Sequence, residues 1–384
     1  MKIQSFGSRL AILASTALTG LAFGLPAHAA ITVYQGSDLV PSVEIYLRVD
    51  AGLVASTNVD LSLYNGKNGT GTVVQGGGND WGTSMFGVDG ALQLNPDTQA
   101  IYKVESGFST TDGSFNGGKN QIFNRRAYVG LSDDRYGSLY FGKDLFIDND
   151  IWGYDPMGQE NMSTATLVNG RNWDQVNDMV EYRSPSTYAL KVGLQASFDK
   201  STIASTNMSK AYGASVQYSI GNLGLLGVYD VMQGQKGYTN LYSASKEAII
   251  GATYDFTPVK IYAGYELLSA PQGDGVNATS ISPNVNTPVY ATHAGMGWLG
   301  AVWTVSPQVT IRGAWFTTSV NHSVGSANLF TVGSEYYFRP NMFLYGTVGE
   351  VLNHGSNQFA ASFGPNPGQG QNQFSGYTGV SVAF

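Results

Sequence analysis

The sequence lacks cysteine and carries few charges, and each absence excludes a class of protein. With no cysteine among 384 residues, neither a disulfide-stapled domain nor a thiolate metal site is possible. Only 12% of the residues are charged, which is about half the usual share. The 27 acidic residues outnumber the 20 basic ones, which argues against nucleic acid as a partner. Beyond residue 29, no apolar run reaches the ~20 residues that a membrane-spanning helix needs.

The first 29 residues form a separate unit. Lys2 and Arg9 give a basic start, an apolar stretch runs from Leu10 to Leu25, and Ala27 to Ala29 offers small residues at the spacing of a cleavage site. This order predicts a secretory signal peptide. A membrane anchor is the less favoured alternative, because polar residues interrupt the apolar stretch. We therefore expect residues 1–29 to be removed and residues 30–384 to form one domain.

The mature sequence is dominated by alternation of apolar and polar residues. In 188–197, 212–220 and 259–267 every second residue is apolar, as in strands with one apolar and one polar face. The polar face is mostly Gly, Ser, Thr, Gln and Tyr with isolated charges, which suits a narrow water-filled lumen. Aromatic residues gather near strand ends, as interfacial girdles require: Trp315, Phe316, Tyr336 to Phe338, Phe343, Tyr345, Phe374 and Tyr377. The pattern predicts an all-β protein, a transmembrane antiparallel β-barrel.

The connections between these strands alternate in length. Seven short turns are expected at 95–98, 133–137, 184–187, 221–222, 257–258, 306–308 and 339–341. Eight long loops are expected at 56–80, 109–120, 146–175, 199–209, 233–243, 269–292, 320–326 and 353–373. This alternation predicts about sixteen strands, and an even number closes the barrel without leaving an edge exposed to lipid.

Several short motifs, in order along the chain, resemble the general porins of Gram-negative bacteria, of the proteobacterial type. They are Ser42 to Leu53 (SVEIYLRVDAGL), Phe86-Gly87, Lys103 to Phe108, Asn124 to Ser132, Val180 to Pro185 and the terminal Phe384. The resemblance runs through the whole mature chain and is densest in its first half. It implies a homotrimer of 16-stranded barrels in the cell outer membrane, in contact with outer-membrane lipid and lipopolysaccharide. It also implies passage of small hydrophilic solutes.

The resemblance further implies that the third long loop, Phe146 to Gln175, folds into the lumen and narrows it. Asp150 and Asp155 then lie at the constriction, opposite a basic wall at positions matching Arg48, Arg125 and Arg183. Opposed charges across a gap would orient water and permeating dipoles and favour polar solutes. The alternatives are an ordinary lumen ion pair for Arg48 and a solvated surface loop for the two aspartates.

This sequence departs from the family pattern in two places. Met85 stands where the family commonly has an arginine, and Arg125 is followed by a second arginine, Arg126. Parity does not decide which of the two arginines faces the lumen, although the resemblance favours Arg125. Lys103 and Glu105 share a strand face and are expected to form a structural pair.

Catalytic and metal sites have little support in the sequence. After processing, the remaining histidines are His293, His322 and His354, without zinc-binding spacing. Weak Ca²⁺ binding by acidic pairs such as Asp133 and Asp134 stays open. We expect no cofactor and no enzyme activity, but an outer-membrane diffusion channel for small hydrophilic solutes and ions. The alternative is a solute-specific porin for sugars or carboxylates. Sugar-specific channels line their path with aromatic side chains, and four aromatic residues are candidates for such a lining: Trp152, Tyr154, Trp173 and Tyr262.

Overall fold

The fold is known from a computed structural model, which describes residues 30–34, 41–116, 121–158, 160–168, 174–198, 208–234, 245–270, 291–321, 325–355, 357–362 and 364–384. The predicted signal peptide, residues 1–29, lies outside the described residues. Among the residues described, none of the helices has the length and apolar character needed to cross a membrane.

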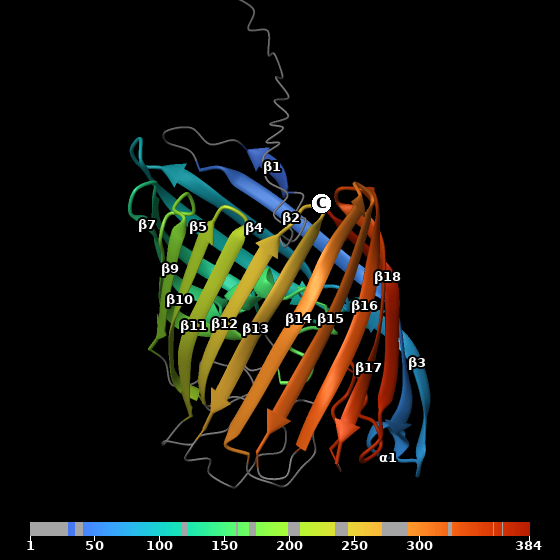
Figure 1. Cartoon of the computed structure of the whole chain (residues 1–384). Coiled ribbons are helices and arrows are strands. Elements are labelled where there is room, and N and C mark those ends of the chain that lie inside the picture. Colours follow the sequence, from blue (N-terminus) through green and yellow to red (C-terminus); the bar gives the residue numbers. More distant parts are fainter. Residues whose placement is uncertain are drawn as a thin grey trace, which may run out of the picture.

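The described chain consists almost entirely of strands (Figure 1). In chain order the elements are β1 (Ala30–Tyr34), β2 (Val43–Asp60), α1 (Leu61–Asn65), β3 (Thr70–Gly78), β4 (Ser84–Gln93), β5 (Thr98–Phe108), β6 (Arg126–Asp133), β7 (Gly137–Leu145), the 3-10 helix η1 (Ile147–Tyr154), β8 (Gln175–Arg183), β9 (Leu190–Ser197), β10 (Met208–Ile220), β11 (Leu223–Gly234), β12 (Lys246–Asp255), β13 (Val259–Ser269), β14 (His293–Ser306), β15 (Val309–Val320), β16 (Gly325–Arg339), β17 (Met342–His354) and β18 (Gln373–Ala383).

The strands form one closed antiparallel barrel. From β4 to β18 each strand pairs with the next, and β18 pairs with β2 to close the wall. β4 pairs with the first half of β2 and β3 with its second half, so β3 and β4 together fill one place in the wall. β1 pairs with the start of β2, beyond the end of β18, and adds no further place. Within the described residues the wall therefore has sixteen positions, as predicted from the alternating connections.

All seven predicted short turns join neighbouring strands. At Gly221 and Asn222 the turn has two residues, because Ile220 pairs with Leu223, and Gly221 has a positive φ of 54° that suits glycine. The first predicted long loop, 56–80, is wrong in detail. β2 continues to Asp60 and β3 returns beside it, with Val73 buried and Val74 exposed on opposite faces of the glycine-rich stretch.

The two faces of the wall have inverted polarity compared with a soluble protein. Outward-facing apolar side chains are well exposed, for example Leu131 (51%), Ile250 (65%) and Val332 (56%). Inward-facing polar side chains such as Glu181 and Ser215 are buried. An apolar surface that encircles the molecule far exceeds the few hundred Å² that soluble proteins tolerate. The outer face therefore contacts lipid, as the alternation predicted.

The predicted aromatic girdles are only partly correct. Trp315, Tyr336, Phe338 and Phe374 are outward and exposed. Four other residues of the prediction are buried on the inner face: Phe316, Phe343, Tyr345 and Tyr377. Consecutive residues of a strand point to opposite faces, so Trp315 and Phe316 cannot both contact lipid.

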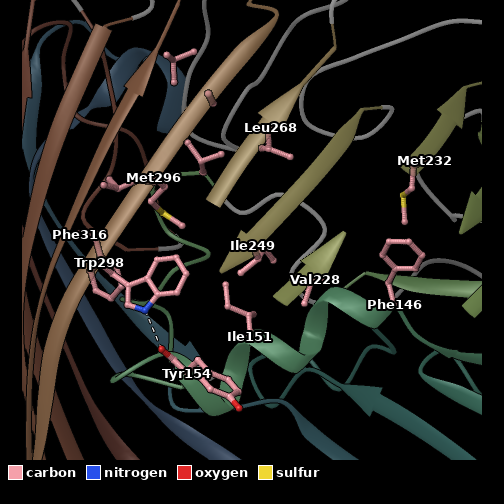
Figure 2. Packing of buried hydrophobic residues seen from close by; sticks show 14 of the residues in the cluster. Phe146, Ile151, Tyr154, Val228, Met232, Ile249, Leu268, Met296, Trp298 and Phe316 are labelled. Atoms are coloured by element: carbon pink, nitrogen blue, oxygen red, sulfur yellow. Dashed lines mark hydrogen bonds between the residues drawn. The ribbon is translucent and has the colours of Figure 1, made fainter. Parts of the chain in front are cut away.

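The inner face is also less uniformly polar than predicted. In the half of the barrel near the long connections, β11 to β17 turn apolar side chains inward, and these form one buried cluster (Figure 2). We call these wall residues the inner apolar band: Val228, Met232, Ile249, Leu268, Met296, Trp298, Phe316, Leu329 and Val351. Apolar residues on an inward face indicate that polypeptide, rather than water, covers them.

Candidate functional site

The candidate site is built by the third connection, residues 146–174, and the wall that it contacts. Its 3-10 helix η1 contacts strands β9 to β13. Ile151 and Tyr154 lie on the side of η1 that faces the inner apolar band, and Trp298 Nε1 donates a hydrogen bond of 2.9 Å to the carbonyl oxygen of Tyr154 (Figure 2). The Tyr154 hydroxyl donates to the carbonyl oxygen of Leu225 at 2.9 Å.

The connection continues along the wall after η1. A Cβ on Gly300 would lie 2.5 Å from Pro156 Cγ, so the connection passes Gly300 closely enough to need a glycine there. Glu160 accepts hydrogen bonds from Thr347 (2.7 Å) and Tyr377 (2.8 Å), on β17 and β18. Residues of this one connection therefore contact strands on both sides of β14.

Arg183 and Asp150 are in direct contact instead of facing each other across a gap. Arg183 Nη1 lies 2.6 Å from Asp150 Oδ2, and its Nε lies 2.5 Å from Glu181 Oε1. Ser215, midway along β10, also donates to Asp150 at 2.5 Å. These contacts join the end of β8 to η1, and the Arg183 side chain keeps 31% of its surface exposed.

Both candidate arginines at the start of β6 reach the same carboxylate. Arg125 Nε lies 2.7 Å from Glu105 Oε1, and Arg126 Nε lies 3.7 Å from that atom and 3.0 Å from Asp144 Oδ1. Strand parity could not choose between the two because Arg125 precedes the regular strand, which begins at Arg126. The expected pair of Lys103 and Glu105 is wrong, since Lys103 Nζ lies 3.6 Å from Asp89 Oδ2.

Arg48 is buried on the inner face of β2, with only 1% of its surface exposed. Its Nε donates to the carbonyl oxygen of Thr83 at 2.7 Å, and its guanidinium lies 5.5 Å from the centre of the Trp81 ring. Arg125 Nη1 donates to the hydroxyl of the same Thr83 at 3.2 Å. The segment between β3 and β4 thus holds two arginines of the predicted basic wall side by side. Met85, in the position where the family commonly has arginine, is buried.

Asp155 is turned toward its own connection. Its two carboxylate oxygens accept from the backbone amides of Met157 (2.8 Å) and Thr164 (2.7 Å), and only 3% of the residue is exposed. Burial raises the pKa of Asp155 to about 6, although these hydrogen bonds oppose the shift. Burial likewise raises the pKa of Glu160 to about 7, against the attraction of Arg312. Asp155 therefore holds the shape of the connection, whereas Asp150 contacts the wall.

Three carboxylates at the site were not predicted to contact the arginines. Glu105, expected to pair with Lys103, contacts Arg125, and Asp144 and Glu181 contact Arg126 and Arg183. The spacing of Glu181 and Arg183, two residues apart on one strand, is a sequence signal for a shared face. We call the resulting set the charged row, and it contains Arg48, Glu105, Arg125, Arg126, Asp144, Asp150, Glu181 and Arg183.

A second charged group lies on β15 and β16. Arg312 Nη2 lies 2.5 Å from Glu335 Oε1, and Arg312 Nη1 lies 3.6 Å from Glu160 Oε1. Trp81 Nε1 also donates to Glu335 at 2.6 Å. These residues are far apart in sequence, so neither spacing nor parity pointed to the group. Among the described residues, no group of His, Cys, Asp and Glu side chains is arranged to hold a metal ion.

The four aromatic residues that suggested a sugar-specific channel lie in different places. Tyr154 and Trp152 pack against the wall, and Tyr262 is buried on the inner face of β13 with Lys260 Nζ 5.0 Å from its ring centre. Trp173 lies outside the described residues. The structure thus places three of the four, all of them against or on the inner side of the wall.

Comparison with known proteins agrees with this architecture. A family model described as Gram-negative porin matches residues 14–356. An outer membrane porin protein of Bordetella pertussis is 25% identical over 376 residues, which cover 88% of this chain and 93% of that protein. Outer membrane porin F of Escherichia coli K12 is 24% identical over 324 residues, covering 79% and 86%.

Solved structures show the same fold. The anion-selective porin from Comamonas acidovorans superposes with a TM-score of 0.70 at 19% identity, covering 90% of this chain and all of that one. The OmpF of Salmonella typhi, solved in complex with daunomycin, superposes with a TM-score of 0.64 at 16% identity, covering 92% and all of it. Because the family match spans most of a chain that closes into a sixteen-position barrel with a lipid-facing apolar surface, this chain belongs to the Gram-negative porins, the outer-membrane channels for small solutes.

Proposed function

We propose that this porin is a general diffusion channel for small hydrophilic solutes and ions, narrowed by the third connection at the charged row. The observation that carries the proposal is the contact of Asp150 with both Arg183 and Ser215. Arg183, at the end of β8, and Ser215, midway along β10, both face inward, which supports a connection that leaves the wall at β7 and lies on the inner side of the strands. It occupies part of the cross-section available to solutes.

The charged row supports a preference for polar solutes. It presents guanidinium and carboxylate groups along β2 and β5 to β8. Hydrogen bonds orient Arg48, Arg125 and Arg183, and an ion pair with Asp144 orients Arg126. Fixed charges of both signs beside a water-filled path orient the dipoles of water and solutes. An apolar solute of equal size would displace oriented water without replacing its interactions. We propose Arg48, Arg125, Arg183 and Asp150 as constriction residues, and Asp155 as a support of the connection.

We also propose that three copies assemble in the outer membrane. From Ile45 to Leu53 the outer face of β2 carries aliphatic side chains: Ile45, Leu47, Val49, Ala51 and Leu53. By contrast, the outer face of β16 carries Phe330, Tyr336 and Phe338, which are typical of contact with the lipid interface. A surface of small aliphatic residues is suited to close packing against another protein, and cyclic symmetry closes such a contact. Lipid and lipopolysaccharide would cover the remaining outer wall.

Planar-bilayer recording tests the proposed function. The purified protein should form open channels, and the reversal potential under a salt gradient should report its ion preference. Liposome swelling should occur with several unrelated small sugars and amino acids at rates that fall with solute size. Swelling restricted to one solute class would instead favour the alternative, a solute-specific channel. An absence of any conductance would contradict both.

A further inference from the structure

The eighth connection, residues 355–372 between β17 and β18, is buried to an unusual degree for a surface loop. Asn357, Phe359, Ala360, Ala361 and Ser362 expose at most 2% of their surface. Long connections normally run over a protein surface and stay exposed. This segment therefore does not extend away from the barrel.

Its burial is on the inner side of the wall. Phe359 and Ala361 belong to one cluster with the inner apolar band, including Phe316, Leu329 and Val351. Those wall residues point inward, because their neighbours Trp315 and Phe330 are exposed on the outer face. They lie near the strand ends that carry the long connections. The cluster thus places the eighth connection within that end of the lumen.

The connection is held there by inward-facing wall residues at its two ends. Asn353, on β17, donates to the carbonyl oxygen of Phe359 at 2.9 Å and accepts from its amide at 3.1 Å. Gln373, on β18, accepts from the amide of Ala361 at 3.0 Å and donates to the carbonyl oxygen of Pro365 at 3.0 Å. Four hydrogen bonds from two side chains define the path of the buried segment.

The outer part of the connection is fixed to β2. Asp60 donates its amide to the carbonyl oxygen of Asn366 at 2.8 Å, and Gly368 donates to the carbonyl oxygen of Asn58 at 2.9 Å. Val59 and Pro367 form an isolated bridge. The connection is therefore anchored to three strands, β17, β18 and β2, which makes it a fixed part of the channel mouth.

The eighth connection also contains no charged residue, since 355–372 reads GSNQFAASFGPNPGQGQN. An uncharged obstacle reduces the open cross-section for all solutes and adds no field that separates anions from cations. From this we infer that the eighth connection is a second narrowing of the channel, which sets the size limit for solutes while the charged row sets ion preference. The inference rests on the proposed channel function.

Removing the buried segment tests the inference. A deletion of residues 358–370 leaves Asn353, Gln373 and the pairing of Val351 with Gln373 intact, and joins the strands by a five-residue loop. We expect single-channel conductance to rise roughly 1.5-fold or more, and larger sugars to enter liposomes, because the obstruction is gone. The reversal potential should stay at the wild-type value, since no charge is removed. Equal conductance and an equal size limit in the deletion variant would overturn the inference.

A point substitution covers the case in which the deletion variant does not fold. Phe359→Ser removes the apolar anchor, and Gln369→Ser alters an exposed residue of the same connection as its matched control. Phe359→Ser should raise conductance and its fluctuation, and Gln369→Ser should leave both unchanged. Identical records for the two variants would count against the inference. If the wild type forms channels but the two variants behave alike, the inference about the eighth connection fails while the proposed channel function stands. If the wild type forms no channel, the proposed function itself fails.

Discussion

The contact between Arg183 and Asp150 gives the sharpest test of how the charged row acts. Arg183→Ser removes a positive charge from the wall and leaves Glu181 and Asp150 without the arginine that contacts both. Asp150→Asn removes a negative charge from η1 and leaves Arg183 with Glu181. The two substitutions change the local charge in opposite directions at one place. We therefore expect ion preference to shift toward cations in Arg183→Ser and toward anions in Asp150→Asn.

The size of the shift follows from Coulomb's law. A unit charge about 6 Å from the path of an ion in water contributes roughly 0.7 kcal/mol, and screening at 0.1 M salt reduces this to about 0.4 kcal/mol. That energy raises the local concentration of one ion about twofold and lowers that of the other about twofold. The permeability ratio then changes about fourfold, which under a tenfold salt gradient moves the reversal potential by roughly 25 mV.

The assay is the reversal potential of single channels in planar bilayers, at low and high salt. Asp155→Asn serves as the matched control, because Asp155 accepts hydrogen bonds from its own connection and does not contact an arginine of the charged row in the described residues. It should leave the reversal potential within a few millivolts of wild type. Unchanged potentials in both Arg183→Ser and Asp150→Asn would refute the reasoning, since the pair would then lie outside the path of the ions.

Four further predictions concern topology, docking, assembly and pH. Lys67→Cys, between α1 and β3, should react with a membrane-impermeant thiol reagent in intact cells, whereas Gln308→Cys, in the short turn after β14, should not; the reverse labelling would invert the orientation. Trp298→Phe removes the hydrogen bond to Tyr154 and should lower stability against thermal unfolding by about 1 kcal/mol, with noisier channel currents, while the outward Trp303→Phe should leave the currents unchanged. Native mass measurement in mild detergent should give three copies, and a strictly monomeric species would contradict the proposed assembly. Burial raises the pKa of Asp155 to about 6, so its contribution favours the folded state at low pH and is lost as pH rises through 6; wild type should gain up to about 3 kcal/mol from this group between pH 8 and pH 4, and Asp155→Asn should lack that part of the gain.

The barrel itself could be predicted because its determinants are local. Alternation with a period of two is visible in any ten residues, and short turns such as Gly221-Asn222 interrupt it at regular intervals. The lipid-facing side of the three segments analysed, 188–197, 212–220 and 259–267, was identified correctly by the same rule. β3 was missed because four of its nine residues are glycine, so only Val73 and Val74 mark it as a strand. β3 pairs with the second half of β2, and the sequence did not show that β2 continues as far as Asp60.

The interior was predicted less well, since it depends on contacts between distant segments. Pairs of adjacent apolar residues, such as Ile249-Ile250, Leu267-Leu268 and Leu329-Phe330, were a usable signal. They show that both faces of a strand are apolar at its long-connection end, which water in the lumen would not favour. The side chains that cover this inner face come from connections whose paths no periodicity specifies.

The candidate site shows the same limit. Resemblance pointed to Arg48, Arg125, Arg183 and Asp150, and the structure brings each into the charged row. It could not tell Asp150 from Asp155, five residues further along, because the direction of each carboxylate is set by the turn of the chain after η1. Asp155 satisfies two backbone amides in that turn, whereas Asp150 meets Arg183.

The composition of the charged row explains why net charge is a poor guide to this channel. The row contains four arginines and four carboxylates, so its formal charge is zero, although the whole chain carries a formal charge of −7. A balanced row attracts neither ion strongly along its length, and the wild-type channel should therefore discriminate weakly between anions and cations. Any single substitution unbalances it by one charge at a fixed point of the proposed constriction. The ion preference of this porin should thus respond to one residue of the row more than to several charges in the outer loops, which bulk water and salt screen within about 10 Å.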